Sequence, residues 1–149
     1  MTGAPLVAVD NLSRVFDVSR SWLDRTIQRL PRQYLVAAAN VSFTIGRKET
    51  FGLVGESGSG KSTIARMVVG LIPPSGGNVV IDGLSMTARV QSGREKLRRR
   101  IQMVFQDPYA SLDPRWRVFD IIAEPIRAFG LCEGRAAIEA RVGELLRLV

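Results

Sequence analysis

The stretch Gly55-Glu56-Ser57-Gly58-Ser59-Gly60-Lys61-Ser62-Thr63 decides how the chain folds. It fits the pattern Gly-x-x-x-x-Gly-Lys-Ser/Thr, in which glycines let the backbone curl so that its N–H groups point at phosphate oxygens. We expect Lys61 to reach the β- and γ-phosphates, Ser62 to ligate Mg²⁺, and Thr63 to hydrogen-bond an α-phosphate oxygen. The alternative is an ordinary Gly/Ser turn, which the joint presence of the spacing, the lysine and the hydroxyl disfavours. The stretch therefore predicts a site for a nucleoside triphosphate.

The flanking segments place this loop between a strand and a helix. Residues 51–54 (FGLV) have the length and apolar character of a buried strand. After the loop, apolar residues recur at helical spacing, at Ile64, Ala65, Met67, Val68 and Leu71. A helix that begins near Lys61 directs the positive end of its dipole at the loop, which favours bound phosphate.

Composition sets the outer limits of the interpretation. With 149 residues, of which 46% are apolar, the chain suffices for one modest globular domain. No stretch approaches the roughly 20 apolar residues of a membrane-spanning helix, and we expect no secretory signal. The single cysteine, Cys132, cannot form an internal disulfide, which fits a reducing cytoplasm and a role as a small filler.

The net charge of +7 raises the question of an anionic partner. The densest basic cluster is residues 94–100 (REKLRRR), and a basic helix face can contact nucleic acid or anionic lipid. No aromatic residue interleaves with these arginines, which weakens a single-strand-binding interpretation. We therefore favour a solvated helix face and expect no nucleic-acid partner.

Other segments have recognisable patterns. Strands are predicted over residues 6–9 and 14–16, on either side of a turn at 11–13, and over residues 41–45. Residues 19–33 look like an insertion, in which the spacing of Leu23, Ile27 and Leu30 predicts a short amphipathic helix. Residues 73–77 (PPSGG) break the chain, and residues 79–83 (VVIDG) offer either a magnesium-binding carboxylate at Asp82 or a tight Asp-Gly turn. We favour the turn, because it follows the preceding helix too soon to be the neighbouring strand of the core.

A second motif follows an apolar strand predicted at residues 101–105. The sequence Gln106-Asp107-Pro108-Tyr109-Ala110-Ser111-Leu112-Asp113-Pro114-Arg115 closely resembles the Q-loop of ABC transporter ATPases. The resemblance is sharpest with subunits that drive import of oligopeptides and dipeptides and, in relatives, of glutathione or nickel. Residues 52–63 and 122–127 (IAEPIR) are similar to the same subfamily. The resemblance extends from about Leu6 to the last residue.

The resemblance implies a fold and a domain plan. The fold is an α/β P-loop NTPase core with a parallel sheet that carries the phosphate loop, an N-terminal antiparallel β region and the start of a helical subdomain. The three parts would be residues 1–50, residues 51–106 and residues 107–149. Because an amphipathic helix with Ile138, Val142, Leu145, Leu146 and Val149 on one face ends without a cap, we expect the N-terminal portion of a longer subunit.

Site residues are implied in the same way. Phe16 lies where an aromatic residue stacks on the adenine of ATP. Tyr34 is the alternative stacking residue, and the structural alternative for Phe16 is a place in the hydrophobic core. The phosphate loop from Gly55 to Thr63 holds ATP and Mg²⁺. Gln106 corresponds to the glutamine that contacts Mg²⁺ or the attacking water, a task that suits an uncharged carboxamide. Apolar contacts to a membrane subunit are expected among Tyr109, Leu112, Trp116 and Phe119, although buried packing explains them equally well.

Partners and activity also follow from the resemblance. It implies transmembrane permease subunits, a second ATP-binding subunit, an indirect role for a solute-binding protein, and a location at the cytoplasmic face of the membrane. Hydrolysis in this family needs a Leu-Ser-Gly-Gly-Gln-type signature, a strand ending in Asp-Glu and a histidine, and this sequence contains none of them. We therefore expect an ATPase in the intact protein and an isolated chain that binds ATP without hydrolysing it. The alternatives are a non-catalytic nucleotide-binding module and an ABC-type ATPase that acts on nucleic acid.

Overall fold

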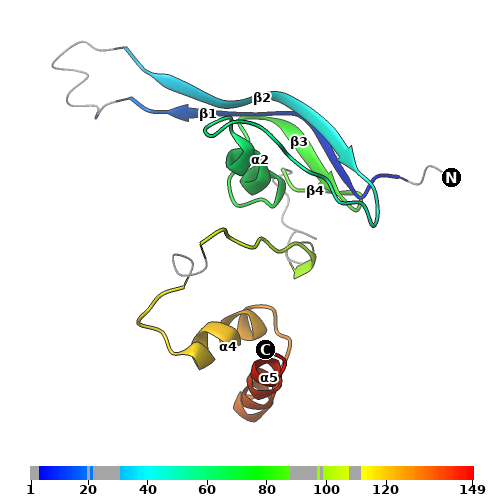
Figure 1. Ribbon diagram of the computed structural model, residues 1–149, viewed down its shortest axis with the longest axis vertical. Coiled ribbons are helices and arrows are strands. Elements are labelled where there is room, and N and C mark those ends of the chain that lie inside the picture. Colours follow the sequence, from blue (N-terminus) through cyan, green and yellow to red (C-terminus); the bar gives the residue numbers. More distant parts are fainter. Residues whose placement is uncertain (1–3, 20, 22–30, 88–96, 98, 108–111) are drawn as a thin grey trace. The chain divides into compact units, whose positions relative to one another are not determined.

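The structure is a computed structural model that describes residues 4–19, 21, 31–87, 97, 99–107 and 112–149 (Figure 1). The chain divides into two compact units, Met1–Gln102 and Met103–Val149. The predicted helix within the 19–33 insertion, Tyr109 and most of the basic cluster at 94–100 lie outside the described residues. Within those residues, no helix combines the length and the apolar character needed to cross a membrane.

The first unit contains a four-stranded antiparallel sheet. Its strands are β1 (Val7–Asp17), β2 (Tyr34–Ile45), β3 (Gly76–Ile81) and β4 (Leu84–Ser85), in the order β2-β1-β3-β4 (Figure 1). Strand β1 is central, and its Val9 lies opposite both Phe43 of β2 and Val79 of β3. This sheet confirms the antiparallel β region that the family resemblance implied near the N-terminus.

The predicted turn at residues 11–13 is wrong. Strand β1 runs through these residues, with Asn11 in the left-handed region at φ 48° and an irregular register between Val9 and Leu12. Asparagine tolerates that conformation, so the chain bulges instead of reversing. Pairing on both sides, with β2 and with β3, keeps the strand continuous.

Helix α2 (Lys61–Val68) packs on this sheet and begins where the helix was predicted. It ends three residues before Leu71, because Gly70 takes φ 75°, and Leu71 is left 55% exposed. The helix buries Ile64 and Met67 against Leu12 and Val79, both of which are completely buried. Each such side chain contributes about 1.5–3 kcal/mol through burial.

Two predicted strands do not form. Residues 51–54 and 101–105 carry no strand assignment, and Val54 and Val104 are 93% and 94% exposed. A strand exists only through the hydrogen bonds of a neighbouring strand. Among the described residues all strand pairings are antiparallel and none involves these two segments, so the predicted parallel sheet is not seen there.

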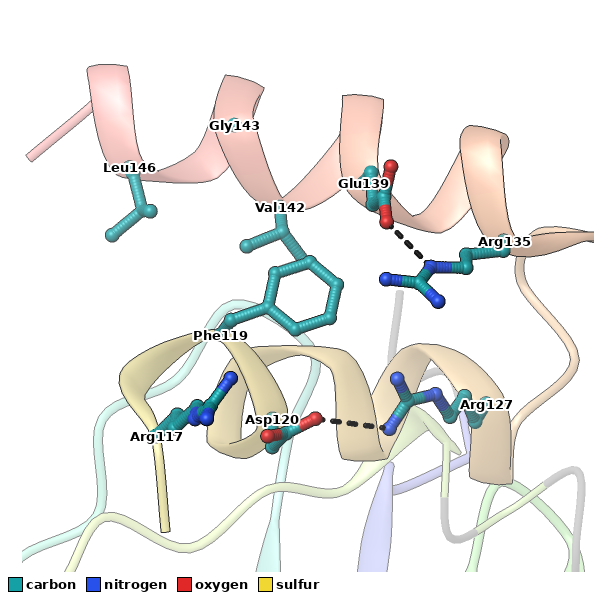
Figure 2. A pocket seen from close by; sticks show the side chains of 9 residues that line it. All are labelled: Arg117, Phe119, Asp120, Arg127, Arg135, Glu139, Val142, Gly143 and Leu146. Carbon is teal, nitrogen blue, oxygen red and sulfur yellow. Dashed lines mark hydrogen bonds and ion pairs between the residues drawn. The ribbon is translucent and has the colours of Figure 1, made fainter.

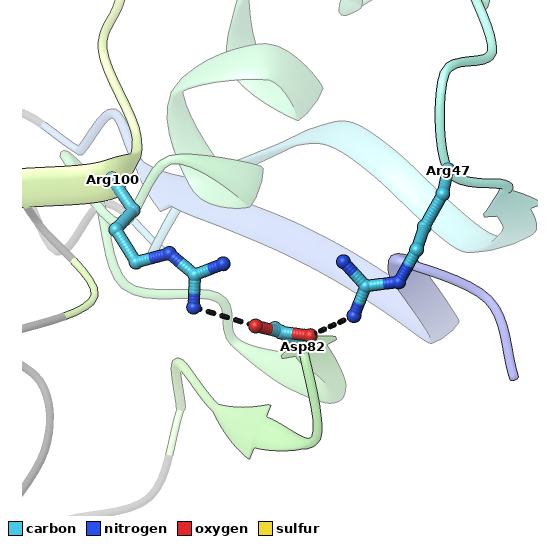
Figure 3. Close-up of polar contacts among 3 residues, drawn as sticks. All are labelled: Arg47, Asp82 and Arg100. Atoms are coloured by element: carbon cyan, nitrogen blue, oxygen red, sulfur yellow. Dashed lines mark hydrogen bonds and ion pairs between the residues drawn. The ribbon is translucent and has the colours of Figure 1, made fainter.

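The Asp82-Gly83 turn is confirmed. Both residues have positive φ, 50° and 78°, as the tight two-residue turn between β3 and β4 requires. The Asp82 carboxylate accepts hydrogen bonds from Arg47 and, at 2.5 Å, from Arg100 (Figure 3). Both arginine hydrogen bonds, that of Arg100 first, hold the pKa of Asp82 below its usual value. Asp82 therefore has a structural role, as the turn interpretation requires.

The described part of the second unit contains two packed helices, α4 (Val118–Ala128) and α5 (Arg135–Arg147). Their small core comprises Ala123, Ile126 and Val142, with Cys132 half-buried beside it. The predicted C-terminal helix is confirmed, and Val142, Ile138 and Leu145 lie on its packed side. The predicted face is wrong for Leu146, which is 47% exposed, and for Val149, which follows the end of α5 and is fully exposed.

Candidate functional site

The glycine-rich loop has the curled backbone that its sequence predicts. Gly58 and Gly60 take φ 81° and 90°, which only glycine adopts without strain. Within the loop, the N–H of Ser59 donates to the carbonyl of Glu56 at 3.2 Å. The N–H of Ile64 then donates to the carbonyl of Gly60 at 2.9 Å, which opens helix α2. The loop therefore ends directly at a helix N-terminus.

Gly60 also joins the loop to the sheet. A β-carbon at residue 60 would lie 2.0 Å from the carbonyl oxygen of Ala37 in β2. Ala37 is itself a bulge residue, because β1 pairs Arg14 with Ala38 and Val15 with Val36 and skips it. The bulge thus presents a backbone surface that only a glycine can approach, and this contact holds the loop against the sheet.

The Lys61 ammonium lies over the loop. Its Nζ donates to the carbonyl oxygens of Gly55 at 2.7 Å and Glu56 at 2.5 Å, and to Ser59 Oγ at 3.4 Å. The first turn of α2 contains no acidic residue. A cation and a helix N-terminus therefore meet at one point of the surface, an arrangement that attracts an anion with several oxygens.

Ser62 as a magnesium ligand stays a prediction. Ser62 is exposed at the start of α2, next to Lys61. Within the described part of the chain, no group of three or more His, Cys, Asp and Glu side chains forms a metal cage. A single hydroxyl suits Mg²⁺, which usually takes one or two protein ligands and fills its shell with phosphate oxygens and water.

Phe16 lies on the same sheet surface as the phosphate loop. Side chains two residues apart on a strand point to the same face, so Arg14 and Phe16 lie on the same face of β1 as buried Leu12, the face that α2 covers. Phe16 is half-buried and pairs with Leu35, two residues from Ala37. Tyr34, the alternative aromatic, pairs with Asp17 and is 57% exposed. Phe16 as the residue that stacks on adenine stays a prediction.

Gln106 belongs to the second unit, where it is exposed in a bend after Phe105. Its contact with magnesium or water therefore stays a prediction. Of the four apolar residues expected at a membrane-subunit contact, Leu112 and Trp116 are 47% and 49% exposed. Phe119 packs against the α4–α5 core, so packing accounts for at least part of its role.

The second unit carries a groove of about 630 Å³ between α4 and α5 (Figure 2). Phe119 and Val142 contribute apolar lining, and the groove is also lined by Arg117, Arg127 and Arg135. Two of these arginines are paired, Arg127 with Asp120 at 3.7 Å and Arg135 with Glu139 at 2.7 Å. Sequence reasoning did not predict this groove, because it depends on how the two helices pack.

Sequence reasoning also missed Arg14. Its guanidinium carbon lies 4.6 Å from the centre of the Phe16 ring, and its Nη1 donates to the carbonyl of Pro73 at 2.8 Å. The available signal was the two-residue spacing of arginine and phenylalanine on one predicted strand, which places both side chains on one face.

Comparison with known proteins gives matches over nearly the whole chain. Residues 38–149 match the family model described as "ABC transporter". A Brucella abortus (strain 2308) protein named "Putative peptide import ATP-binding protein BAB2_1053" is 48% identical over 145 residues, which cover 97% of this chain and 41% of that protein. The "Glutathione import ATP-binding protein GsiA" of Escherichia coli (strain K12) is 42% identical over 147 residues, 99% of this chain and 23% of that protein. The chain thus spans less than half the length of either relative.

A solved structure shows a similar fold. The ATP-binding cassette MJ0796, in a dimeric post-hydrolysis state bound to ADP and Pi, has a TM-score of 0.69 at 23% sequence identity. The match covers 95% of this chain and 54% of that chain. At this identity the likeness establishes a common fold.

Proposed function

The chain belongs to the ABC transporter family, and we propose that it is the N-terminal part of an ATP-binding subunit that powers solute uptake. The observation that carries the proposal is the position of Lys61. Its ammonium donates to carbonyl oxygens of the glycine-rich loop, beside the N-terminus of α2. When a triphosphate binds, phosphate oxygens would replace these carbonyls as the hydrogen-bond acceptors of the ammonium.

Each residue of the loop has a proposed task. The backbone N–H groups from Glu56 to Gly60 surround the phosphates, and Lys61 neutralises the charge of the β- and γ-phosphates. Thr63 hydrogen-bonds an α-phosphate oxygen. Ser62 would hold Mg²⁺, which supplies positive charge that stabilises the transferring phosphoryl group. Gln106 orients the attacking water through its carboxamide oxygen.

We propose that the substrate class is peptides, including small ones such as glutathione. Support comes from the names of the relatives at 48% and 42% identity, which are import proteins for peptides and for glutathione. Selection of one solute belongs to membrane subunits, because the residues described above recognise a nucleotide.

The partners follow from the same proposal. Permease subunits would bind at the second unit, where Leu112 and Trp116 are exposed, and the protein would lie at the cytoplasmic face of the membrane. A second ATP-binding subunit would supply the signature motif that this sequence lacks, and the dimeric state of the structural relative supports such pairing. Closure of two subunits around ATP would then bias the permease through the difference in ATP affinity between open and closed states.

The proposal is tested by calorimetry of the full chain with ATP and magnesium. We expect heat of binding, and at least about tenfold weaker binding after Lys61→Met, because a charge-assisted contact to phosphate is lost. Lys48→Met is the matched control, since it removes the same charge from an exposed turn. Wild-type protein that is folded and binds neither ATP nor GTP would refute the proposal.

A further inference from the structure

Arg14 and Phe16 form a stacked pair on strand β1. The guanidinium of Arg14 covers one face of the ring, with 4.6 Å between its central carbon and the ring centre. An aromatic face is electron-rich, so a cation is attracted to it. One face of Phe16 is therefore occupied by a side chain of the same strand.

The guanidinium is held in this place by the loop that follows α2. Arg14 Nη1 donates to the Pro73 carbonyl at 2.8 Å. On either side of Arg14 the same loop bonds to β1: the Ser75 N–H donates to the Ser13 carbonyl at 2.8 Å, and the Val15 N–H donates to Ser75 Oγ at 3.1 Å. The loop and the strand are thus hydrogen-bonded to each other on both sides of the arginine.

The arginine gives up a hydrogen bond in this position. Its Nε is buried and has no hydrogen-bond partner among the described residues. A buried donor without an acceptor is unfavourable, and an arginine that turned outward would bond this donor to water. Contact with the ring and with Pro73 therefore outweighs full solvation of the guanidinium.

We propose that Arg14 is a positioning residue for recognition of the nucleobase. It fixes the Phe16 ring from one face, so that a base would stack on the other. Because the cation draws electron density toward its own side, the opposite face becomes a better partner for an electron-rich purine than for a pyrimidine. This inference rests on the proposed function, and specifically on a base that stacks on Phe16.

The structure also links the two ends of the nucleotide site. Helix α2 starts at the phosphate loop, and the segment after its C-terminus bonds to Arg14 through Pro73. The Arg14–Phe16 pair, here called the base platform, and the phosphate loop are thus attached to the two ends of one helix. A shift of that helix would therefore move both parts of the site together.

The test compares ligands with and without a base. Calorimetry on the full chain measures ATP, CTP and inorganic triphosphate, each with magnesium, for wild type, Arg14→Met and Arg14→Lys. We expect Arg14→Met to weaken ATP binding about three- to tenfold, to narrow the ATP-over-CTP preference, and to leave triphosphate binding unchanged. Arg14→Lys, which keeps a cation over the ring, should restore part of the preference.

Two further variants make the result decisive. Arg99→Met removes the same charge from an exposed position and should behave as wild type for all three ligands. Phe16→Ala should remove the base-dependent part of ATP affinity. Circular dichroism checks folding, and Arg14→Gln replaces Arg14→Met if the latter does not fold, because glutamine keeps a neutral donor for Pro73.

The failures are distinguishable. An unchanged ATP-over-CTP preference in Arg14→Met, or equal weakening of ATP and triphosphate, would show that Arg14 serves only the fold. An unchanged ATP affinity in Phe16→Ala would overturn the inference while leaving the phosphate site intact. Wild type that binds neither triphosphate nor ATP would overturn the proposed function itself.

Discussion

Gly60 lies so close to Ala37 that a β-carbon on residue 60 would stand 2.0 Å from the Ala37 carbonyl oxygen. The contact joins the phosphate loop to the bulge of β2, and it explains why glycine is needed at this position beyond its φ of 90°. Loop curvature is a local property, whereas this contact joins residues 23 positions apart in the sequence.

The first prediction concerns this contact. Gly60→Ala should lower the free energy of unfolding by clearly more than Gly83→Ala, as measured by urea denaturation. Gly83 has a similar φ of 78° but open space around its α-carbon, so its substitution costs only backbone strain of about 1–2 kcal/mol. Equal losses in the two variants would show that the loop does not press on Ala37 in solution.

The second prediction concerns the core beneath the phosphate helix. Leu12 is completely buried between the sheet and α2, so Leu12→Ala should lower the free energy of unfolding by about 2–5 kcal/mol. Leu84→Ala, at a position 44% exposed, should cost much less. Similar urea midpoints for the two variants would contradict the packing described here.

The third prediction concerns the Asp82 ion pairs with Arg47 and Arg100. Their hydrogen bonds lower the pKa of Asp82 in the folded state, so the stability they contribute is present above the unfolded-state pKa of about 3.9 and is lost as pH falls through the folded-state pKa. Asp82→Asn should therefore destabilise the protein slightly at neutral pH and match wild type in strong acid. Asparagine also tolerates the positive φ of this turn.

Thermal unfolding at a series of pH values measures this difference. Asp10→Asn removes a carboxylate from the same sheet, one that accepts a hydrogen bond from Asn11 Nδ2 at 3.0 Å, and serves as the control. Added salt should reduce the effect of Asp82→Asn, because exposed ion pairs are screened. If the stability difference between Asp82→Asn and wild type instead grew toward acid pH, the prediction would be contradicted.

The fourth prediction concerns turnover. The 149-residue chain contains no histidine and no Asp-Glu pair, so the groups that position water and stabilise the transferring phosphoryl group are incomplete. We expect the purified chain to bind ATP with no steady-state phosphate release above background. Release that Lys61→Ala abolishes would show that the 149-residue chain suffices for catalysis.

Local features were predictable because neighbouring residues determine them. The start of α2 at Lys61 follows from apolar spacing and a preceding glycine, and the Asp82-Gly83 turn follows from two residues that accept positive φ. The family was also recognisable, because the phosphate loop and the segment after Gln106 are two separate motifs with characteristic spacing.

Strand pairing was less predictable. Residues 51–54 and 101–105 have the composition of buried strands, yet they carry no strand assignment. Residues 11–13 have the composition of a turn, yet β1 continues through them because β2 and β3 hold it on both sides. Composition describes one segment, whereas a strand requires hydrogen bonds from another.

By itself, the sequence determined the chemistry of the phosphate loop: the glycines that curl it, the lysine and the two hydroxyls. Only the tertiary structure decided where that loop rests and what surrounds the base platform. The contact of Gly60 with Ala37 and the stacking of Arg14 on Phe16 depend on a bulge in one strand and on a loop more than 50 residues away. Such contacts arise from packing between distant segments, and local residue preferences do not encode them.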